Sequence, residues 1–212
     1  MINDLASKLV QRLAHPLPGR EAQFKMASSF RVPQDYVPDT KNAKISGVLI
    51  ALYFDNNTLR TILMKRPDYK GPHSGQVSFP GGKREPADKD IVATALREAQ
   101  EEVALASEHV QVIGQLSELY VPASNFLVHP VIGVLSTTPI LTADNREVAH
   151  ILLPDVTQFF NIEKVGVKSI QINEGLTIKA PFFDVEGHVV WGATAMILSE
   201  LTQVLSEVGF ER

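Results

Sequence analysis

Three glutamates close together are the residues of this sequence best suited to chemistry. Glu98, Glu101 and Glu102 occupy positions i, i+3 and i+4, a spacing that places their carboxylates on one side of a helix. The glycine-containing segment 79–82 (Phe-Pro-Gly-Gly) precedes them and lets the backbone approach a ligand closely. Clustered carboxylate oxygens suit a hard divalent cation such as Mg²⁺ or Mn²⁺, which bridges to substrate phosphates. The alternative interpretation is a solvated acidic helix face.

The segments that must position these carboxylates follow from the pattern of apolar and turn-forming residues. Asp90 is the predicted N-cap of a helix that runs to about Leu105, with its apolar residues in one stripe. Upstream, 45–54 and 58–65 are predicted to form a hairpin, because turn formers separate two β-branched, apolar runs. A short strand is expected within 76–79, and 80–82 is expected to open a loop with unusual backbone freedom.

The rest of the chain is predicted to be mainly strands, followed by a closing helix. Strands are expected at 110–121, 126–135, 148–153, 165–172 and 176–183, with a short helix near 157–160 and an amphipathic helix over 194–208. No repeat or linker is visible, so the sequence predicts one α+β domain over 45–212. A flank, 1–44, precedes it, with a helix at 2–14; it is expected to cap the domain or to build a homodimer contact.

Composition excludes several classes of protein. The chain has 212 residues, 44% hydrophobic and 21% charged, with a net charge of −4, which is typical of a globular protein and gives no basic tract for nucleic acid. No apolar run reaches the roughly 18 residues of a membrane helix, and no secretory signal is visible, so a cytoplasmic location is expected. The sequence has no cysteine, so any metal must be bound by oxygen or imidazole.

The run from Gly82 to Leu105 resembles the box of the Nudix hydrolase family. That box reads Gly, five residues, Glu, seven residues, Arg-Glu, an apolar residue, any residue, Glu-Glu, any residue, Gly and an apolar residue. The matching residues are Gly82, Arg97, Glu98, Ala99, Glu101, Glu102 and Leu105. Asp88 stands where the box has its first Glu, eight residues rather than seven precede Arg97, and Ala104 replaces the last Gly.

This resemblance implies both a fold and a reaction. The fold is the Nudix α/β/α sandwich, in which a mixed β-sheet lies between helices. The reaction is hydrolysis of a diphosphate with Mg²⁺ or Mn²⁺, held by Glu98, Glu101 and Glu102 with the Gly82 carbonyl, while Arg97 orients the glutamates.

Residues 62–82 are similar to a signature of the coenzyme A pyrophosphohydrolase branch of that family. The matching residues are Arg66, Gly75, Val77, Phe79 and Pro80–Gly82, whereas Met64, Pro67 and Gly71 depart from the signature. The similarity extends to 126–133 and 191–194. It implies that the substrate is coenzyme A or acyl-CoA and that the products are 3′,5′-ADP and 4′-phosphopantetheine or its acyl derivative. The candidate substrate-binding residues are Arg66, Lys70, His73 and Phe79.

Alternatives remain open for the individual residues. Arg66 and Lys70 suit phosphate, but surface solubility also explains them. His73 contacts substrate or is a solvated loop residue. Glu147 is a general base, an extra cation ligand or a loop-edge residue without a role, and the base is undecided between Glu102 and Glu147.

Two alternatives also remain open for the function. The first is a Nudix enzyme that acts on ADP-ribose, NADH or a nucleoside triphosphate. The second is a catalytically silent module that only recognises a nucleotide.

Overall fold

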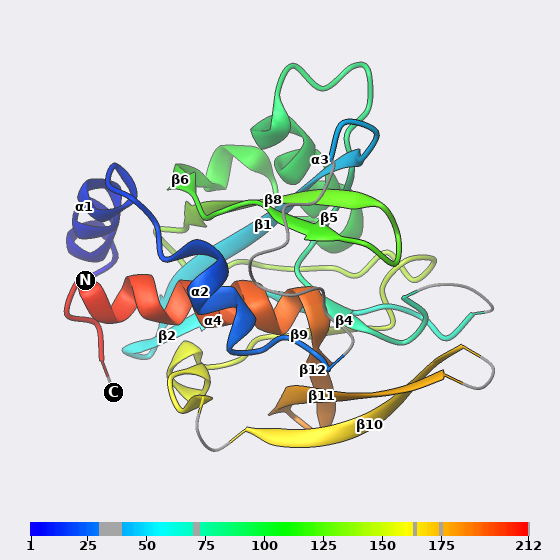
Figure 1. The fold of residues 1–212 in the computed structure, drawn as a ribbon. Helices are drawn as coiled ribbons and strands as arrows, with labels where there is room; N and C mark the ends of the chain where they lie inside the picture. The colour runs from blue at the N-terminus through cyan, green and yellow to red at the C-terminus, as the bar shows by residue number, and fades with distance from the viewer. Residues whose placement is uncertain (30–39, 70–72, 163–164, 174–175, 212) are drawn as a thin grey trace.

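A mixed sheet forms the centre of the protein in a computed structural model that describes residues 1–29, 40–69, 73–162, 165–173 and 176–211 (Figure 1). Its longest strand, β1 (Lys44–Asp55), pairs antiparallel with β2 (Thr58–Thr61) and β5 (Gly81–Lys83) and parallel with β8 (Phe126–Val134). Strand β8 pairs antiparallel with β6 (Gln111–Gln115) and β7 (Leu119–Val121). The sheet order is β2-β1-β8-β6, with β5 on β1 and β7 on β8.

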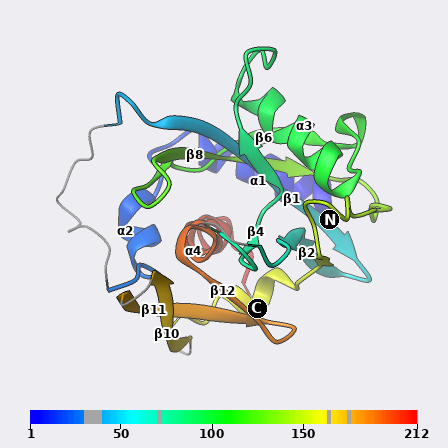
Figure 2. The ribbon, with the colours of Figure 1, turned by 90° about the vertical axis from the view of Figure 1, so that its right-hand side faces the viewer.

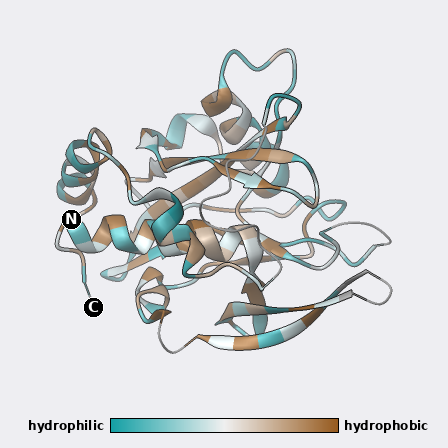
Figure 3. Cartoon of the chain, in the orientation of Figure 1, coloured by the Kyte–Doolittle hydropathy of each residue, from teal (hydrophilic) through white to brown (hydrophobic). Residues whose placement is uncertain are grey.

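The two faces of this sheet bury separate cores because side chains alternate along β1. Leu49, Ala51 and Tyr53 face the helix α3 (Ile91–Val103), whereas Ile50 and Leu52 face α4 (Gly192–Glu207). Figure 2 shows α3 and α4 on opposite sides of the central strands, and Figure 3 shows how apolar those strands are. The predicted α+β fold, with a mixed sheet between helices, is confirmed.

Two smaller sheets complete the fold. Strand β3 (Leu63–Lys65) lies between β4 (Val77–Ser78) and β9 (His150–Leu152), and β11 (Leu176–Val185) lies between β10 (Gly166–Asn173) and β12 (His188–Trp191). The 3₁₀ helices are η1 (Ser107–His109) and η2 (Val156–Phe159). The predicted strands are all present, although 58–65 is divided into β2 and β3, which lie in different sheets, and 110–121 is divided into β6 and β7. Strands β5 and β12 were not predicted.

The prediction of a free loop at 80–82 is wrong. Gly81 and Gly82 pair with β1, and a Cβ on Gly81 would lie 2.4 Å from the carbonyl oxygen of Gly47. Gly81 has a φ of 156°, which side chains disfavour. These glycines therefore permit close strand pairing rather than loop freedom.

The described part of the N-terminal flank packs on α4. The predicted helix is α1 (Ile2–Leu13), and a second helix, α2 (Gly19–Phe24), was not predicted. Leu5, Leu9 and Met26 are buried in the core that α4 shares. The Ser199 hydroxyl on α4 donates to the carbonyl of Ala22 at 2.6 Å. Across the described ranges, every helix is too short or too polar to cross a bilayer.

Candidate active site

Helix α3 presents its glutamates because both of its ends are fixed. At the start, the Asp90 carboxylate accepts a hydrogen bond from the Ala93 amide at 2.8 Å, as the predicted N-cap requires. At the end, Ala104 adopts a left-handed conformation with φ 57°, and the Leu105 amide donates to the Ala99 carbonyl at 3.2 Å. Ala104 replaces the last glycine of the Nudix box and takes the left-handed backbone conformation that a glycine favours.

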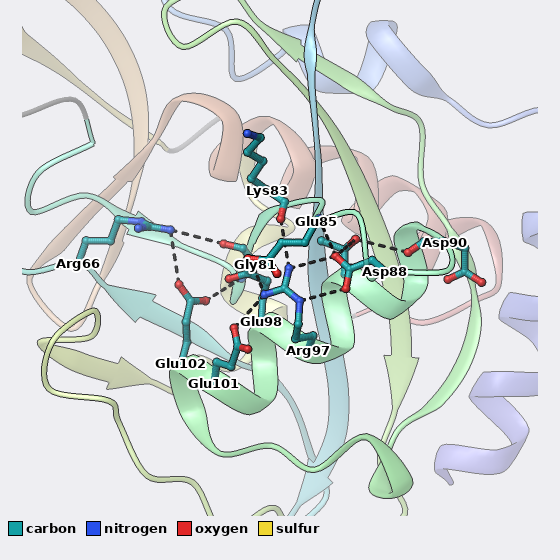
Figure 4. A network of polar contacts seen from close by, with 11 residues as sticks. Arg66, Gly81, Lys83, Glu85, Asp88, Asp90, Arg97, Glu98, Glu101 and Glu102 are labelled. Carbon is teal, nitrogen blue, oxygen red and sulfur yellow. Dashed lines mark hydrogen bonds and ion pairs between the residues drawn. The ribbon is translucent and has the colours of Figure 1, made fainter.

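Glu102 is the most buried of the three predicted carboxylates. Its side chain is 2% exposed, against 57% for Glu101. The Gly81 amide donates to Glu102 Oε2 at 2.8 Å, so strand β5 holds the carboxylate directly. Arg66 approaches from the other side, with Nη2 3.6 Å from Glu102 Oε1 (Figure 4). Arg66 and β5 thus meet at the same carboxylate.

Arg97 lies at the centre of the polar network in Figure 4. Its Nε and Nη2 donate to the two oxygens of Asp88 at 3.0 and 3.1 Å. Its Nη1 lies 3.0 Å from Glu98 Oε1 and 2.9 Å from Glu101 Oε2, and Nη2 also donates to the carbonyl of Lys83 at 3.2 Å. One guanidinium therefore joins two glutamates of α3 to the segment that follows β5.

Asp88 anchors this guanidinium, a role that the sequence did not reveal. The residue is 8% exposed and also accepts hydrogen bonds from the Thr94 hydroxyl and the Glu85 amide, both at 2.9 Å. The hydrogen bonds from Arg97 hold the pKa of Asp88 well below its usual value. The only sequence indication of this role is that Asp88 stands where the Nudix box has its first glutamate.

Two of the other carboxylates, Glu98 and Glu102, have raised pKa values, chiefly because they are buried. Burial raises the pKa of Glu98, and burial raises the pKa of Glu102 to about 8. The negative charge of Glu147 adds to both effects, after that of burial. Gly82 packs on this group so closely that a Cβ there would lie 2.5 Å from the Glu98 carboxylate.

The carboxylate oxygens of this site are chemically suited to bind a divalent cation. In the described part of the chain, no three acidic or histidine side chains converge on one point, because Arg97 holds Glu98 and Glu101 while Arg66 faces Glu102. The buried, mutually repelling carboxylates nevertheless supply the hard oxygens that Mg²⁺ and Mn²⁺ prefer. A positive ion here would relieve that repulsion.

The predicted substrate-binding residues have different surroundings. Arg66 lies beside the carboxylates, as described above. His73 has Nδ1 3.0 Å from Gln76 Oε1 in the loop after β3. Phe79 is 2% exposed and packs in the core on the α4 side, which corrects the prediction that its ring contacts substrate. Lys70 lies outside the described residues.

Comparisons with known proteins agree on one family. The family model described as the NUDIX domain matches residues 44–174. A Photorhabdus laumondii protein named uncharacterized Nudix hydrolase NudL is 36% identical over 142 residues, covering 67% of this chain and 75% of that protein. A Yersinia pestis protein of the same name is 33% identical over 145 residues, covering 68% and 72%.

A solved structure supports the same fold. The MutT/nudix family protein from Enterococcus faecalis superposes with a TM-score of 0.54 at 12% sequence identity. The match covers 88% of this chain and 73% of that one.

Proposed function

The chain belongs to the Nudix hydrolase family, and from this premise we propose that it hydrolyses the diphosphate bond of coenzyme A or acyl-CoA. The products would be 3′,5′-ADP and 4′-phosphopantetheine or its acyl derivative. The reaction would use Mg²⁺ or Mn²⁺, as Nudix hydrolases generally do. The substrate is a small molecule; the proposal involves no nucleic acid and no membrane.

One observation carries the hydrolytic part of this proposal. The glycines of β5 pack directly on the carboxylates of α3: the Gly81 amide is bound to Glu102, and Gly82 lies against Glu98. Arg66 brings a positive charge to the same place. A diphosphate is a polyanion, so it needs both a cation held by the glutamates and a cationic side chain to bind beside them.

Each residue of the site has a role in this proposal. Glu98 and Glu102, with Glu101 and the Gly82 carbonyl, would hold the cation. When bound, the cation would neutralise charge on the diphosphate and make a water molecule more acidic. Arg97, fixed by Asp88, orients Glu98 and Glu101.

Three other side chains complete the proposed assignment. Arg66 binds a phosphate oxygen of the substrate. Glu102 or Glu147 would accept the proton of the attacking water. His73, in the loop that follows Arg66, contacts a more distant part of the substrate.

The coenzyme A assignment is supported by the signature residues around this site. Of these residues Arg66 lies at the carboxylates, whereas Val77 and Phe79 pack in the core on the α4 side and contribute to the fold. Met64, which departs from the signature, is fully buried in the core on the α3 side, so this departure changes packing rather than a ligand contact. ADP-ribose, NADH and nucleoside triphosphates are the competing substrates.

A product-resolved assay tests the proposal. Purified protein with Mg²⁺ or Mn²⁺ is given coenzyme A, ADP-ribose, NADH and a nucleoside triphosphate, and kcat/KM is measured for each. We expect 3′,5′-ADP from coenzyme A with the highest kcat/KM. Preference for another diphosphate would retain the reaction but reject coenzyme A, and no turnover of any of them would favour a silent nucleotide-binding module.

A further inference from the structure

Thr94 is a fully buried polar residue of α3, at 0% exposure. It precedes Arg97 by three residues, so the two side chains lie on one face of the helix. The Thr94 hydroxyl lies 2.9 Å from Asp88 Oδ2 and 3.4 Å from the carbonyl oxygen of Asp90. Its single proton is donated along the shorter contact, to the negatively charged oxygen. Thr94 therefore binds the carboxylate that anchors Arg97.

The Asp88 carboxylate joins the segment after β5 to α3. Its Oδ1 accepts a hydrogen bond from Arg97 Nε at 3.0 Å, and its Oδ2 accepts one from Arg97 Nη2 at 3.1 Å. The Glu85 amide donates to the same Oδ2 at 2.9 Å, and the Asp88 amide donates to the Glu85 carbonyl at 3.1 Å, so this contact lies within the segment itself. Among the described residues of α3, Thr94 and Arg97 are the two whose side chains bind this carboxylate.

The contact between Asp88 and Arg97 depends on the orientation of the carboxylate. A guanidinium binds both oxygens of a carboxylate only when the two planar groups are aligned. The torsion that turns an aspartate carboxylate has a broad energy profile, so the group needs partners to fix it. The Thr94 hydroxyl supplies this from the helix and the Glu85 amide supplies it from the segment. Figure 4 shows the result, with Asp88 facing the guanidinium of Arg97.

We propose that Thr94 is a positioning residue of the cation site. Its hydroxyl fixes the Asp88 carboxylate in the orientation that binds Arg97 through both oxygens, and Arg97 in turn orients Glu98 and Glu101. The inference rests on the proposed function, because it takes these glutamates as cation ligands. Thr94 is fully buried, so it acts on the site through Asp88 and not by touching the substrate.

A hydroxyl that serves only its own helix bonds to a carbonyl of that helix. Thr202 on α4 does so: it is 3% exposed, and its hydroxyl donates to the Ser199 carbonyl at 3.0 Å. Thr94 has an acceptor of this kind in the Asp90 carbonyl, yet its hydroxyl lies closer to the charged oxygen of Asp88. A hydrogen bond to a charged group is stronger than one between neutral groups, and a buried charge that loses a donor is left poorly solvated. The bond is therefore strong enough to fix the carboxylate.

Thr94→Val tests this proposal, because valine keeps the branched shape and lacks the hydroxyl. The readouts are the Mn²⁺ dissociation constant from isothermal titration, kcat with the preferred diphosphate, and urea unfolding without metal. We expect Mn²⁺ binding to weaken about 10-fold and kcat to fall about 10-fold, as when an outer-shell partner of a cation ligand is lost. Thr94→Ser keeps the hydroxyl donor, so both values should stay within about threefold of the wild type.

Thr202→Val is the matched control, because it removes a buried hydroxyl from the helix on the other side of the sheet. It should lower stability as Thr94→Val does, while Mn²⁺ binding and kcat stay within about twofold of the wild type. Asp88→Ala gives a second test. Because Thr94 acts through Asp88, adding Thr94→Val to Asp88→Ala should change the Mn²⁺ affinity by less than about twofold.

Wild-type Mn²⁺ affinity and kcat in a folded Thr94→Val protein would overturn the proposal, and so would an equal loss in Thr202→Val or in Thr94→Ser. Additive effects of Asp88→Ala and Thr94→Val would also overturn it. If the wild type binds Mn²⁺ but hydrolyses no diphosphate, the proposed function fails, and Mn²⁺ titration of the variants still decides the role of Thr94. A wild type that binds no Mn²⁺ would overturn both.

Discussion

Glu102 and Glu200 are buried glutamates on opposite sides of the central sheet, and their surroundings differ. Glu200, on α4, is 0% exposed and accepts hydrogen bonds from the Gly19 amide at 3.0 Å, the Gln23 side chain at 2.9 Å and the Ser117 amide at 3.3 Å. Glu102, on α3, is 2% exposed, has one backbone donor and faces other carboxylates. Burial alone therefore does not mark a functional residue. Incomplete hydrogen bonding beside like charges does.

The largest expected effect is the loss of activity in Glu102→Gln. Removing this carboxylate takes away a cation ligand or the base, so kcat should fall about 1,000-fold, within the range for general acid–base groups. Tm without metal should change little below about pH 8, where burial keeps Glu102 protonated, and should rise above it, because the change then removes a poorly solvated charge. Steady-state kinetics and thermal melts check both expectations. An active Glu102→Gln enzyme would show that the reaction does not need Glu102, just as we expect for Glu200.

Asp88→Asn should have the next largest effect, because it weakens the anchor of Arg97. The amide keeps the shape but loses the charge that binds the guanidinium through two oxygens. We expect kcat to fall about 100-fold, as when a residue that orients cation ligands is lost, and stability to fall by about 3 kcal/mol, as for a broken buried ion pair. Urea unfolding and kinetics measure the two effects. Wild-type kcat would show that Arg97 needs no anchor.

Glu200→Gln should change stability and not activity. The glutamine side chain cannot accept all the hydrogen bonds that now join α4 to α2 and to the segment before β7. We expect a loss of about 2 kcal/mol in the free energy of unfolding, with kcat within about twofold of wild type. A kcat loss as large as that of Glu102→Gln would mean that this carboxylate also serves the reaction.

The pH dependence of stability should reveal the buried carboxylate of Glu102. Burial raises the pKa of Glu102 from 4.5 to about 8, so the stability linked to its protonated form is complete below 4.5 and is lost as pH rises through about 8. Without metal, Tm should therefore fall between these values. The slope should be shallower in Glu102→Gln than in the wild type. An equal slope in the two proteins would refute the assignment to Glu102.

Ala104→Gly should have the smallest effect, a gain in stability at the end of α3. Alanine in the left-handed conformation costs about 1–2 kcal/mol, and glycine returns about 0.5–1 kcal/mol of that as backbone entropy. The net gain should be about 0.5 kcal/mol, or a rise in Tm of about 1–2 °C. A fall in Tm would show that the Ala104 methyl group contributes packing.

Local patterns in the sequence predicted much of the fold and part of the site. The N-cap at Asp90 and the apolar stripe of α3 are encoded within a few residues, so that helix was predicted nearly to its ends. Helix α2 is short and owes its place to contacts with Glu200, far along the chain, which no local pattern contains. Phe79 was misassigned because its position in a signature does not tell whether its ring faces a ligand or the core.

Titration with Mn²⁺ tests the central claim most directly, namely that the buried carboxylates around Glu102 form a cation site. Bound Mn²⁺ can be counted by electron paramagnetic resonance in the wild type, Glu102→Gln and Glu200→Gln, with folding checked in the same samples. We predict that Glu102→Gln weakens binding at least about 10-fold while Glu200→Gln binds as the wild type does. Wild-type Mn²⁺ affinity in a folded Glu102→Gln protein would contradict the account.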